Sequence, residues 1–143
     1  MTTTRKIRPL LTGATSPNEA NDCTVRALAN AKNIEYGTAH DLLKSLGRKD
    51  RKGCTARVWA AAYRDAGLTL VGVYGKTCRA RSLARLEGVE ARKGTTLGTL
   101  LPSIASGRFV VMLTGHAIAV IDGQVIDRFA SLAGSSVFGV YRV

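Results

Sequence analysis

The segment that decides the fold is residues 108–129, RFVVMLTGHAIAVIDGQVIDRF. It contains three apolar runs, RFVVMLT, HAIAVI and QVIDRF, and their composition predicts three strands. Asp122-Gly123, between the second and third runs, is a strong signal for a two-residue hairpin turn. The segment therefore predicts antiparallel strands joined by a tight turn.

The turn also sets the register of the last two strands. If these two residues form the loop, Ile121 pairs with Gln124, and His116 and Asp127 become diagonal neighbours on one face of the sheet. Diagonal Cβ atoms lie roughly 7–8 Å apart or less, which an imidazole and a carboxylate can span. Taken separately, the two residues would be a strand-end histidine and a solvated carboxylate. Together they predict that Asp127 orients His116, as the third member of a catalytic triad does.

The rest of the chain predicts helices before strands. A helix begins at or just before Cys23, where Asn21 or Asp22 can serve as the N-cap. Residues 75–95 are rich in Gly, Arg and Lys and give no clear prediction. Further helices are predicted over 36–46, 56–66 and 97–105, and further strands over 68–74 and 137–143. This order indicates an α+β domain, with an antiparallel sheet packed against an N-terminal helical half.

Length and composition fit one globular domain. The chain has 143 residues, of which 45% are hydrophobic and 22% charged, enough for one buried core. Residues 1–17 are polar and basic, and we predict an N-terminal arm there, followed by a single domain over residues 18–143. No apolar run approaches the roughly 20 residues that span a bilayer, and the N-terminus lacks the apolar stretch of a secretory leader. We therefore expect a cytoplasmic protein without membrane contact.

Cys23 is the candidate nucleophile. Backbone N–H groups and the helix dipole at the start of a helix stabilise a thiolate, which is the reactive form of cysteine. The alternative is a small buried hydrophobic residue, as free cysteines usually are. We interpret Cys54, Cys78 and the helical His40 as incidental. Three widely spaced cysteines and two distant histidines predict neither a disulfide framework nor a structural zinc site, and we expect no metal and no cofactor.

The charge of the chain indicates anionic partners. Lysine and arginine total 21 against 10 acidic residues, a net charge of +11, and such a surface attracts polyanions and acidic protein faces. The basic residues cluster at 48–52, 79–85 and 92–93. An acidic protein, nucleic acid or a virion interior packed with DNA fits this charge, and solvated loops are the alternative. Aromatic residues make up only 6% of the chain and do not interleave with the clusters, which disfavours a stacking platform for single strands.

Three segments, NDCTVRALANA, YGTAHDLLKSLGR and GRFVVMLTGHAIAVIDGQVIDRF, resemble the papain-like cysteine peptidase superfamily, and within it small phage-encoded and C39-like members. The resemblance extends from about Asn18 to Phe129, and its motifs are short. It implies a papain-like fold in which a cysteine opens the central helix, a histidine starts a strand of the sheet, and an aspartate on the next strand orients the histidine. These roles fall on Cys23, His116 and Asp127, with a polypeptide or another acyl compound as substrate. A phage-encoded member would act in the cytoplasm of the host or in the virion.

The superfamily usually carries a glutamine six residues before the cysteine, as a donor to the oxyanion. This chain has Pro17 at that position. We expect Asn18 to replace it, with the Cys23 backbone N–H as the second donor, and Asn21 is a weaker candidate. Two hypotheses follow. The triad residues favour a thiol hydrolase, most concretely a cysteine peptidase. The net charge and Pro17 favour a catalytically inactive protein on the same fold, a basic binding or structural component of a phage virion or of a host interaction.

Overall fold

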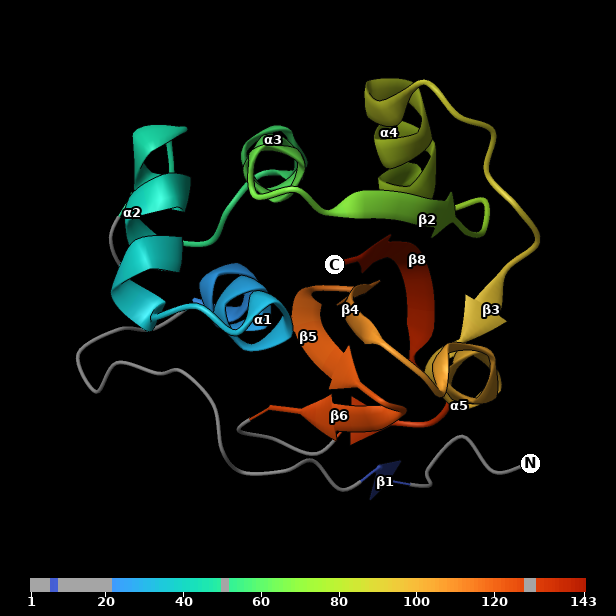
Figure 1. Cartoon of the computed structure of the whole chain (residues 1–143). Helices are drawn as coiled ribbons and strands as arrows, with labels where there is room; N and C mark the ends of the chain where they lie inside the picture. The colour runs from blue at the N-terminus through green and yellow to red at the C-terminus, as the bar shows by residue number, and fades with distance from the viewer. Residues whose placement is uncertain (1–5, 8–21, 50–51, 128–130) are drawn as a thin grey trace.

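The computed structural model describes residues 6–7, 22–49, 52–127 and 131–143 (Figure 1). Its helices are α1 (Cys23–Lys32), α2 (Tyr36–Ser45), α3 (Ala56–Asp65), α4 (Cys78–Glu87), α5 (Leu97–Leu100) and the short 3-10 helix η1 (Leu101–Ile104). Its strands are β1 (Lys6–Ile7), β2 (Thr69–Val73), β3 (Thr95–Thr96), β4 (Arg108–Leu113), β5 (His116–Ile121), β6 (Gln124–Ile126), β7 (Ser131–Leu132) and β8 (Ser136–Arg142). No helix within these ranges is both long and apolar enough to cross a membrane.

An antiparallel sheet forms the centre of the fold. Its strand order is β2-β8-β4-β5-β6, and β3 pairs with one end of β8. Strands β1 and β7 form a separate antiparallel pair. The predicted α+β class, with an antiparallel sheet beside an N-terminal group of helices, is confirmed. The order departs from the prediction at α4, which also follows β2; the helix predicted over 97–105 corresponds to α5 and η1.

The predicted hairpin is confirmed. Ala119 pairs with Ile126, as the two-residue turn requires. Asp122 and Gly123 have φ angles of 50° and 79°, which is the left-handed conformation that a type I′ turn needs at both central residues. The second strand of the hairpin, β6, is shorter than predicted, because it ends at Ile126. Residues 128–130 lie outside the described part of the chain.

Helix α4 lies in the segment for which the sequence predicts no element. Thr77 caps its start, because the Thr77 hydroxyl accepts a hydrogen bond from the Ala80 N–H over 3.2 Å. Gly88, in the left-handed conformation, ends it. A Cβ atom at Gly139 of β8 would lie 2.8 Å from Leu83 Cδ2, so the glycine allows α4 to approach the sheet closely. The buried residues of α4 follow helical spacing: Ala80, Leu83 and Ala84.

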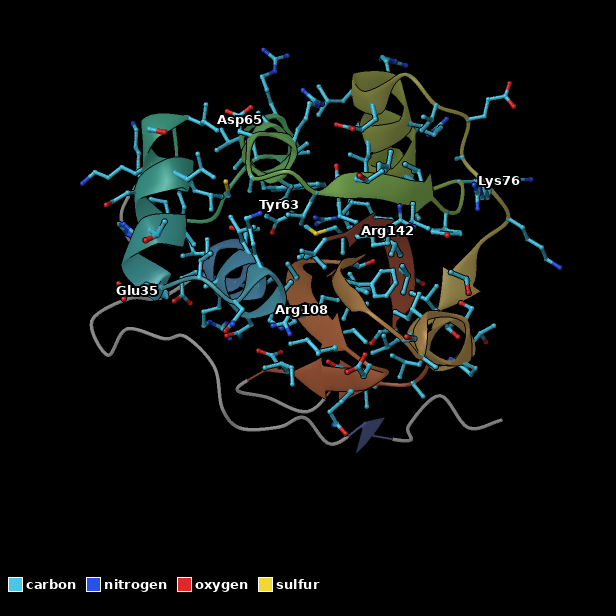
Figure 2. The ribbon with its side chains drawn as sticks, in the orientation of Figure 1. Glu35, Tyr63, Asp65, Lys76, Arg108 and Arg142 are labelled. Carbon is cyan, nitrogen blue, oxygen red and sulfur yellow. The ribbon has the colours of Figure 1, made fainter. Side chains whose placement is uncertain are left out.

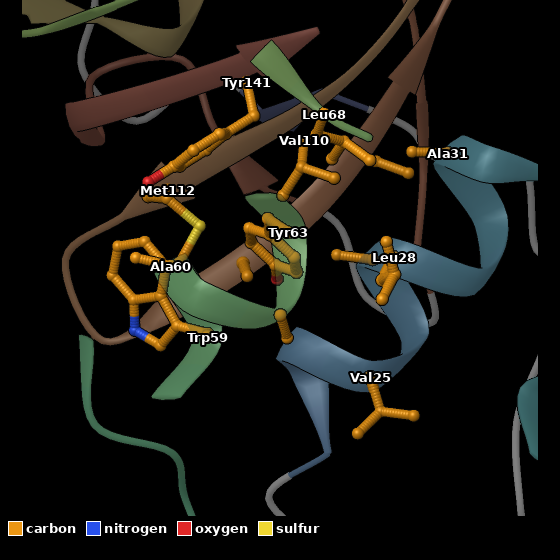
Figure 3. Packing of buried hydrophobic residues seen from close by; sticks show 14 of the residues in the cluster. Val25, Leu28, Ala31, Trp59, Ala60, Tyr63, Leu68, Val110, Met112 and Tyr141 are labelled. Carbon is orange, nitrogen blue, oxygen red and sulfur yellow. The ribbon is translucent and has the colours of Figure 1, made fainter. Parts of the chain in front are cut away.

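The sheet separates two apolar clusters, because side chains alternate between its faces. On β4, Val110 and Met112 face the helices α1 to α4, and Val111 faces α5 and η1. The larger cluster contains an aromatic group in which Tyr63 of α3 and Tyr141 of β8 lie 5.4 Å apart between ring centroids (Figure 3). Helices therefore cover both faces of the sheet.

Helix α1 is fixed against the sheet near both of its ends. At its C-terminal end, Arg108 of β4 donates hydrogen bonds to the carbonyls of Asn30 and Ala31 (Figure 2). These carbonyls belong to the last turn, which has no partners within the helix. Near its N-terminal end, the Tyr63 hydroxyl donates to the Thr24 carbonyl over 3.0 Å. These contacts hold the first residue of α1 next to β5, which lies directly beside the helix (Figure 1).

Candidate active site

The structure brings Cys23, His116 and Asp127 together from three elements. Cys23 is the first residue of α1, His116 is the first residue of β5, and Asp127 directly follows β6. The Nε2 atom of His116 lies 2.6 Å from Oδ2 of Asp127, so the contact predicted from the hairpin register is confirmed. The carboxylate is 2% exposed, whereas the imidazole is 29% exposed and reaches the surface. The ring therefore has one fixed side and one accessible side.

The accessible side of the imidazole faces the cysteine. Burial of the Cys23 thiol acts to raise its pKa, but a hydrogen bond from His116, the charge of His116 and a hydrogen bond from the Ala117 backbone N–H act against it, and the pKa is lowered overall. Because Nε2 of His116 is engaged with Asp127, Nδ1 is the ring nitrogen left for the sulfur. A lowered pKa increases the thiolate fraction near neutral pH.

The histidine shifts in the complementary direction. Its hydrogen bond to Asp127, followed by its hydrogen bond to Cys23, raises the pKa of His116 from 6.5 to about 9 in spite of partial burial. A lowered cysteine pKa beside a raised histidine pKa favours the thiolate–imidazolium pair over two neutral groups. A thiolate and an imidazolium can therefore coexist in the site, as nucleophilic catalysis by cysteine requires.

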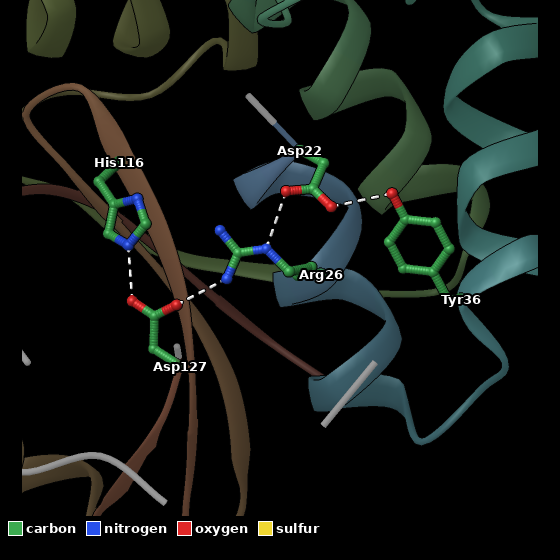
Figure 4. Close-up of polar contacts among 5 residues, drawn as sticks. All are labelled: Asp22, Arg26, Tyr36, His116 and Asp127. Carbon is green, nitrogen blue, oxygen red and sulfur yellow. Dashed lines mark hydrogen bonds and ion pairs between the residues drawn. The ribbon is translucent and has the colours of Figure 1, made fainter. Parts of the chain in front are cut away.

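Asp127 has a second partner, which the sequence analysis does not predict. Arg26, the fourth residue of α1, donates from Nη1 to Oδ1 of Asp127 over 2.8 Å and from Nε to Oδ1 of Asp22 over 2.9 Å. The Tyr36 hydroxyl donates to the other oxygen of Asp22 over 2.9 Å. Figure 4 shows these contacts as one continuous chain from His116 to α2.

This chain of contacts replaces the helix cap expected at Asp22. Asp22 occupies the N-cap position of α1, but its side chain makes no capping hydrogen bond, because both of its oxygens bind Arg26 and Tyr36. A sequence signal for this arrangement exists: Arg26 interrupts an apolar run, and a buried arginine requires carboxylate partners. Its two hydrogen-bonded carboxylates raise the pKa of Arg26 against the opposing effect of burial.

A cleft of about 220 Å³ opens beside the pair of Cys23 and His116, and we name it the Cys23 cleft. Cys54 also lines it, although the sequence interpretation set that cysteine aside. Burial is the main cause that raises the pKa of Cys54, so the two thiols of one cleft shift in opposite directions. The other lining residues are Thr24, Gly53, Trp59, Arg79, Met112, Leu113, Gly115 and Phe138.

The remaining sequence candidates lie elsewhere. Cys78 is exposed at the start of α4 and does not line the cleft. His40 contacts the ring of Tyr36 on α2, with 5.9 Å between centroids, and is also outside the cleft. Asn18, the expected oxyanion donor, lies outside the described residues, as do Pro17 and Asn21. Within the described residues, no group of three or more His, Cys, Asp or Glu side chains is arranged to hold a metal ion.

Comparison with known proteins adds no family to this geometry. No protein-family model, no curated protein and no solved structure matches the chain.

Proposed function

We propose that this chain is a thiol hydrolase, most concretely a cysteine peptidase with a papain-like fold. The observation that carries the proposal is the line of contacts from the Cys23 thiol through the His116 imidazole to the Asp127 carboxylate, beside a cleft. A nucleophile within reach of a base that a third group orients is the pattern of nucleophilic catalysis. The papain-like assignment is supported by α1, which begins at the nucleophile and packs on an antiparallel sheet.

The roles of the three residues follow from their protonation. The Cys23 thiolate attacks the carbonyl carbon of the substrate and forms a tetrahedral intermediate. The His116 imidazolium then donates its proton to the leaving amine as the C–N bond breaks, which leaves a thioester on Cys23. Neutral His116 next takes a proton from water, the hydroxide attacks the thioester, and the carboxylic acid product departs as the thiolate returns. Asp127 holds the ring in one orientation through both halves of the reaction.

The oxyanion of the tetrahedral intermediate needs donors near the sulfur. The backbone N–H of Cys23 is one, because the first N–H groups of a helix have no partner within it. We propose the Asn18 side chain as the second, in the place of the glutamine that Pro17 replaces. Loss of one such donor typically costs about 10²–10³-fold in turnover, so Asn18→Ala measures that role directly.

Selective alkylation tests the proposed nucleophile. At about pH 6, iodoacetamide should modify Cys23 much faster than Cys54 or Cys78, as measured by mass spectrometry of tryptic peptides, because the pKa of Cys23 is lowered whereas that of Cys54 is raised. Cys54 is the matched control, since it lines the same cleft. Hydrolysis of an unfolded protein should be lost in Cys23→Ala and kept in Cys54→Ala. Equal alkylation of the three thiols, with no hydrolysis by the parent chain, would rule out the hydrolase.

A second candidate function is a catalytically inactive, basic binding or structural protein on the same fold, in a phage virion or a host interaction. The net charge of +11 and Pro17 favour it. It requires no reactive cysteine, so the alkylation experiment separates the two functions. Both functions are compatible with the cytoplasm of a host cell.

A further inference from the structure

Two further hollows lie in succession beside the Cys23 cleft. Phe138 lines both the cleft and a second hollow of about 230 Å³. Gly75 and Gly94 line that second hollow and also a third hollow of about 570 Å³. Because each hollow shares lining residues with the next, the three lie in a row from Cys23 past the end of β8 to the loops beside β2 and β3, and we name this row the groove.

Positive charge lines this groove at both ends. Arg79 lines the Cys23 cleft. The third hollow, which we name the basic hollow, is lined by four cationic side chains: Lys76, Arg81, Arg92 and Lys93. All five cations are exposed, and among the described residues none of them forms an ion pair. No Asp or Glu appears among the described residues that line the three hollows.

The basic hollow is formed by ordered structure. Arg92 donates from its backbone N–H to the Val73 carbonyl over 2.7 Å, and the Gly75 N–H donates to the Arg92 carbonyl over 2.9 Å. These two bonds attach the segment that follows α4 to the end of β2, where Lys76 lies (Figure 2). Arg79 and Arg81 stand on the capped first turn of α4. A rigid backbone under the cations reduces the ordering cost of binding an anionic partner.

The lining between the two charged ends suits an extended peptide. The second hollow is lined by Thr114 and Ser136, whose hydroxyls can bind backbone amides. The hydroxyls of Thr77, Thr95 and Thr96, which also line it, make hydrogen bonds within the chain. Among the described residues, none that lines the basic hollow is aromatic, and sequence-tolerant binding of single-stranded nucleic acid depends on aromatic stacking. The position of the groove beside the cysteine also favours a partner that carries an acyl group for Cys23 to attack.

We propose that this groove binds an acidic segment of a polypeptide substrate, with its carboxylates in the basic hollow and its reacting carbonyl at Cys23. The inference rests on the proposed hydrolase, because it names the substrate class of the same site. Under this proposal, the acidic residues of the substrate lie several positions away from the cleaved bond, and all of them lie on the same side of that bond in the substrate sequence. Arg79 would select a further acidic residue close to that bond.

Binding is measured first without chemistry, in Cys23→Ala. Fluorescein-labelled octaglutamate should bind, as followed by anisotropy, and octaglutamine and octalysine should not. Binding should weaken between about 50 and about 200 mM salt, because exposed ion pairs carry it. When Arg81→Gln/Arg92→Gln is added to the Cys23→Ala variant, the affinity for octaglutamate should fall by about 5–30-fold. The matched control is Arg57→Gln/Arg142→Gln, which removes the same charge from exposed residues that line none of the hollows, and it should leave most of the affinity.

Two outcomes of this experiment would contradict the proposal that the groove binds an acidic peptide. Equal losses in the two double variants would mean that net charge alone attracts the peptide. Tighter binding of labelled octathymidylate than of octaglutamate, with the same dependence on Arg81 and Arg92, would assign the basic hollow to nucleic acid.

A second experiment links the basic hollow to Cys23 in the parent chain. Two fusion peptides are compared, one with octaglutamate before hexaalanine and one with hexaalanine before octaglutamate. One of the two should protect Cys23 from iodoacetamide, and octaglutamate alone or hexaalanine alone should not. Protection without hydrolysis would support the groove and count against the hydrolase. Hydrolysis of acidic and neutral peptides at equal rates, unchanged by Arg81→Gln/Arg92→Gln, would support the hydrolase and overturn the groove.

Discussion

Arg26 donates a hydrogen bond from Nη1 to Oδ1 of Asp127 over 2.8 Å, across 101 residues of sequence. The other oxygen of the same carboxylate contacts His116 over 2.6 Å. Asp127 therefore lies between a permanent cation and a titratable ring, since arginine keeps its charge in proteins. Because this cation stands on the helix that begins at Cys23, the helix that carries the proposed nucleophile also holds the group that orients the proposed base.

Replacement of Arg26 by lysine tests this coupling. A guanidinium reaches two carboxylates through separate nitrogens, whereas an ammonium is a point charge that cannot reproduce both contacts. Arg26 is 8% exposed in its side chain and cannot exchange the lost contact for water easily. We expect Arg26→Lys to lower the free energy of unfolding by about 1–3 kcal/mol and also to reduce turnover at temperatures where the variant is folded. Urea unfolding and initial rates measure the two effects.

The control for Arg26→Lys is Tyr36→Phe at the far end of the same chain of contacts. It removes the hydroxyl that donates to Asp22 and should cost about 1 kcal/mol of stability, with turnover close to that of the parent. If the two variants lose turnover in proportion to their stability alone, Arg26 has a structural role only.

The carboxylate itself is tested by Asp127→Asn against Asp122→Asn. The first substitution removes the charge beside His116 and Arg26 and should lower turnover, by less than the factor of about 10⁶ that loss of a triad nucleophile costs. It should also lower stability, because the buried guanidinium loses one of its two carboxylates. Asp122 stands in the turn and accepts from the Gly107 N–H over 2.9 Å, which an asparagine oxygen can also do. Equal turnover in both variants would contradict the assignment of Asp127.

The hairpin could be predicted because it depends on a local signal. The two-residue turn at Asp122-Gly123 sets the first pair of the hairpin, and this pair determines which residues face each other along the rest of the two strands. The start of α1 was predicted at the right residue, but Asp22 occupies the N-cap position without the expected capping hydrogen bond. The partners of Asp127 could be predicted only in part, because Arg26 approaches from an element that is distant in sequence.

Helix α4 was missed because arginines and lysines dominate its segment. The sequence does contain a start signal for this helix at Thr77 and a stop signal at Gly88. These local signals alone do not predict a helix here, because its stability also depends on packing against β8.

Gly139→Ala tests the close packing of α4. The new methyl would lie 2.8 Å from Leu83 Cδ2, so the leucine or the helix has to move. Overpacking of this kind costs about 1–3 kcal/mol, and a displaced α4 would also move Arg79 at the Cys23 cleft. We expect lower stability together with weaker binding of octaglutamate. Gly37→Ala is the matched control, since a Cβ there meets nothing within 4 Å. Unchanged stability in Gly139→Ala would mean that Leu83 adjusts without cost.

The pH dependence of turnover tests the thiolate–imidazolium pair. The pKa of Cys23 is lowered and that of His116 is raised to about 9, so the pair exists at pH values between the two. Turnover should rise with pH as Cys23 loses its proton and fall near pH 9 as His116 loses the proton that the leaving group needs. The measurement is kcat/KM between about pH 5 and pH 10.

Asp127→Asn should move only the upper limb of this profile. The hydrogen bond to Asp127 is the largest cause that raises the pKa of His116, and an amide carries no charge to stabilise the imidazolium. The falling limb should therefore shift to lower pH by about 1–2 units, whereas Asp122→Asn should leave it in place because the turn carboxylate does not contact the ring. A falling limb that stays near pH 9 in Asp127→Asn would show that another group controls it. In that case Asp127 would serve to hold Arg26 and α1, and the proposed triad would reduce to the pair of Cys23 and His116.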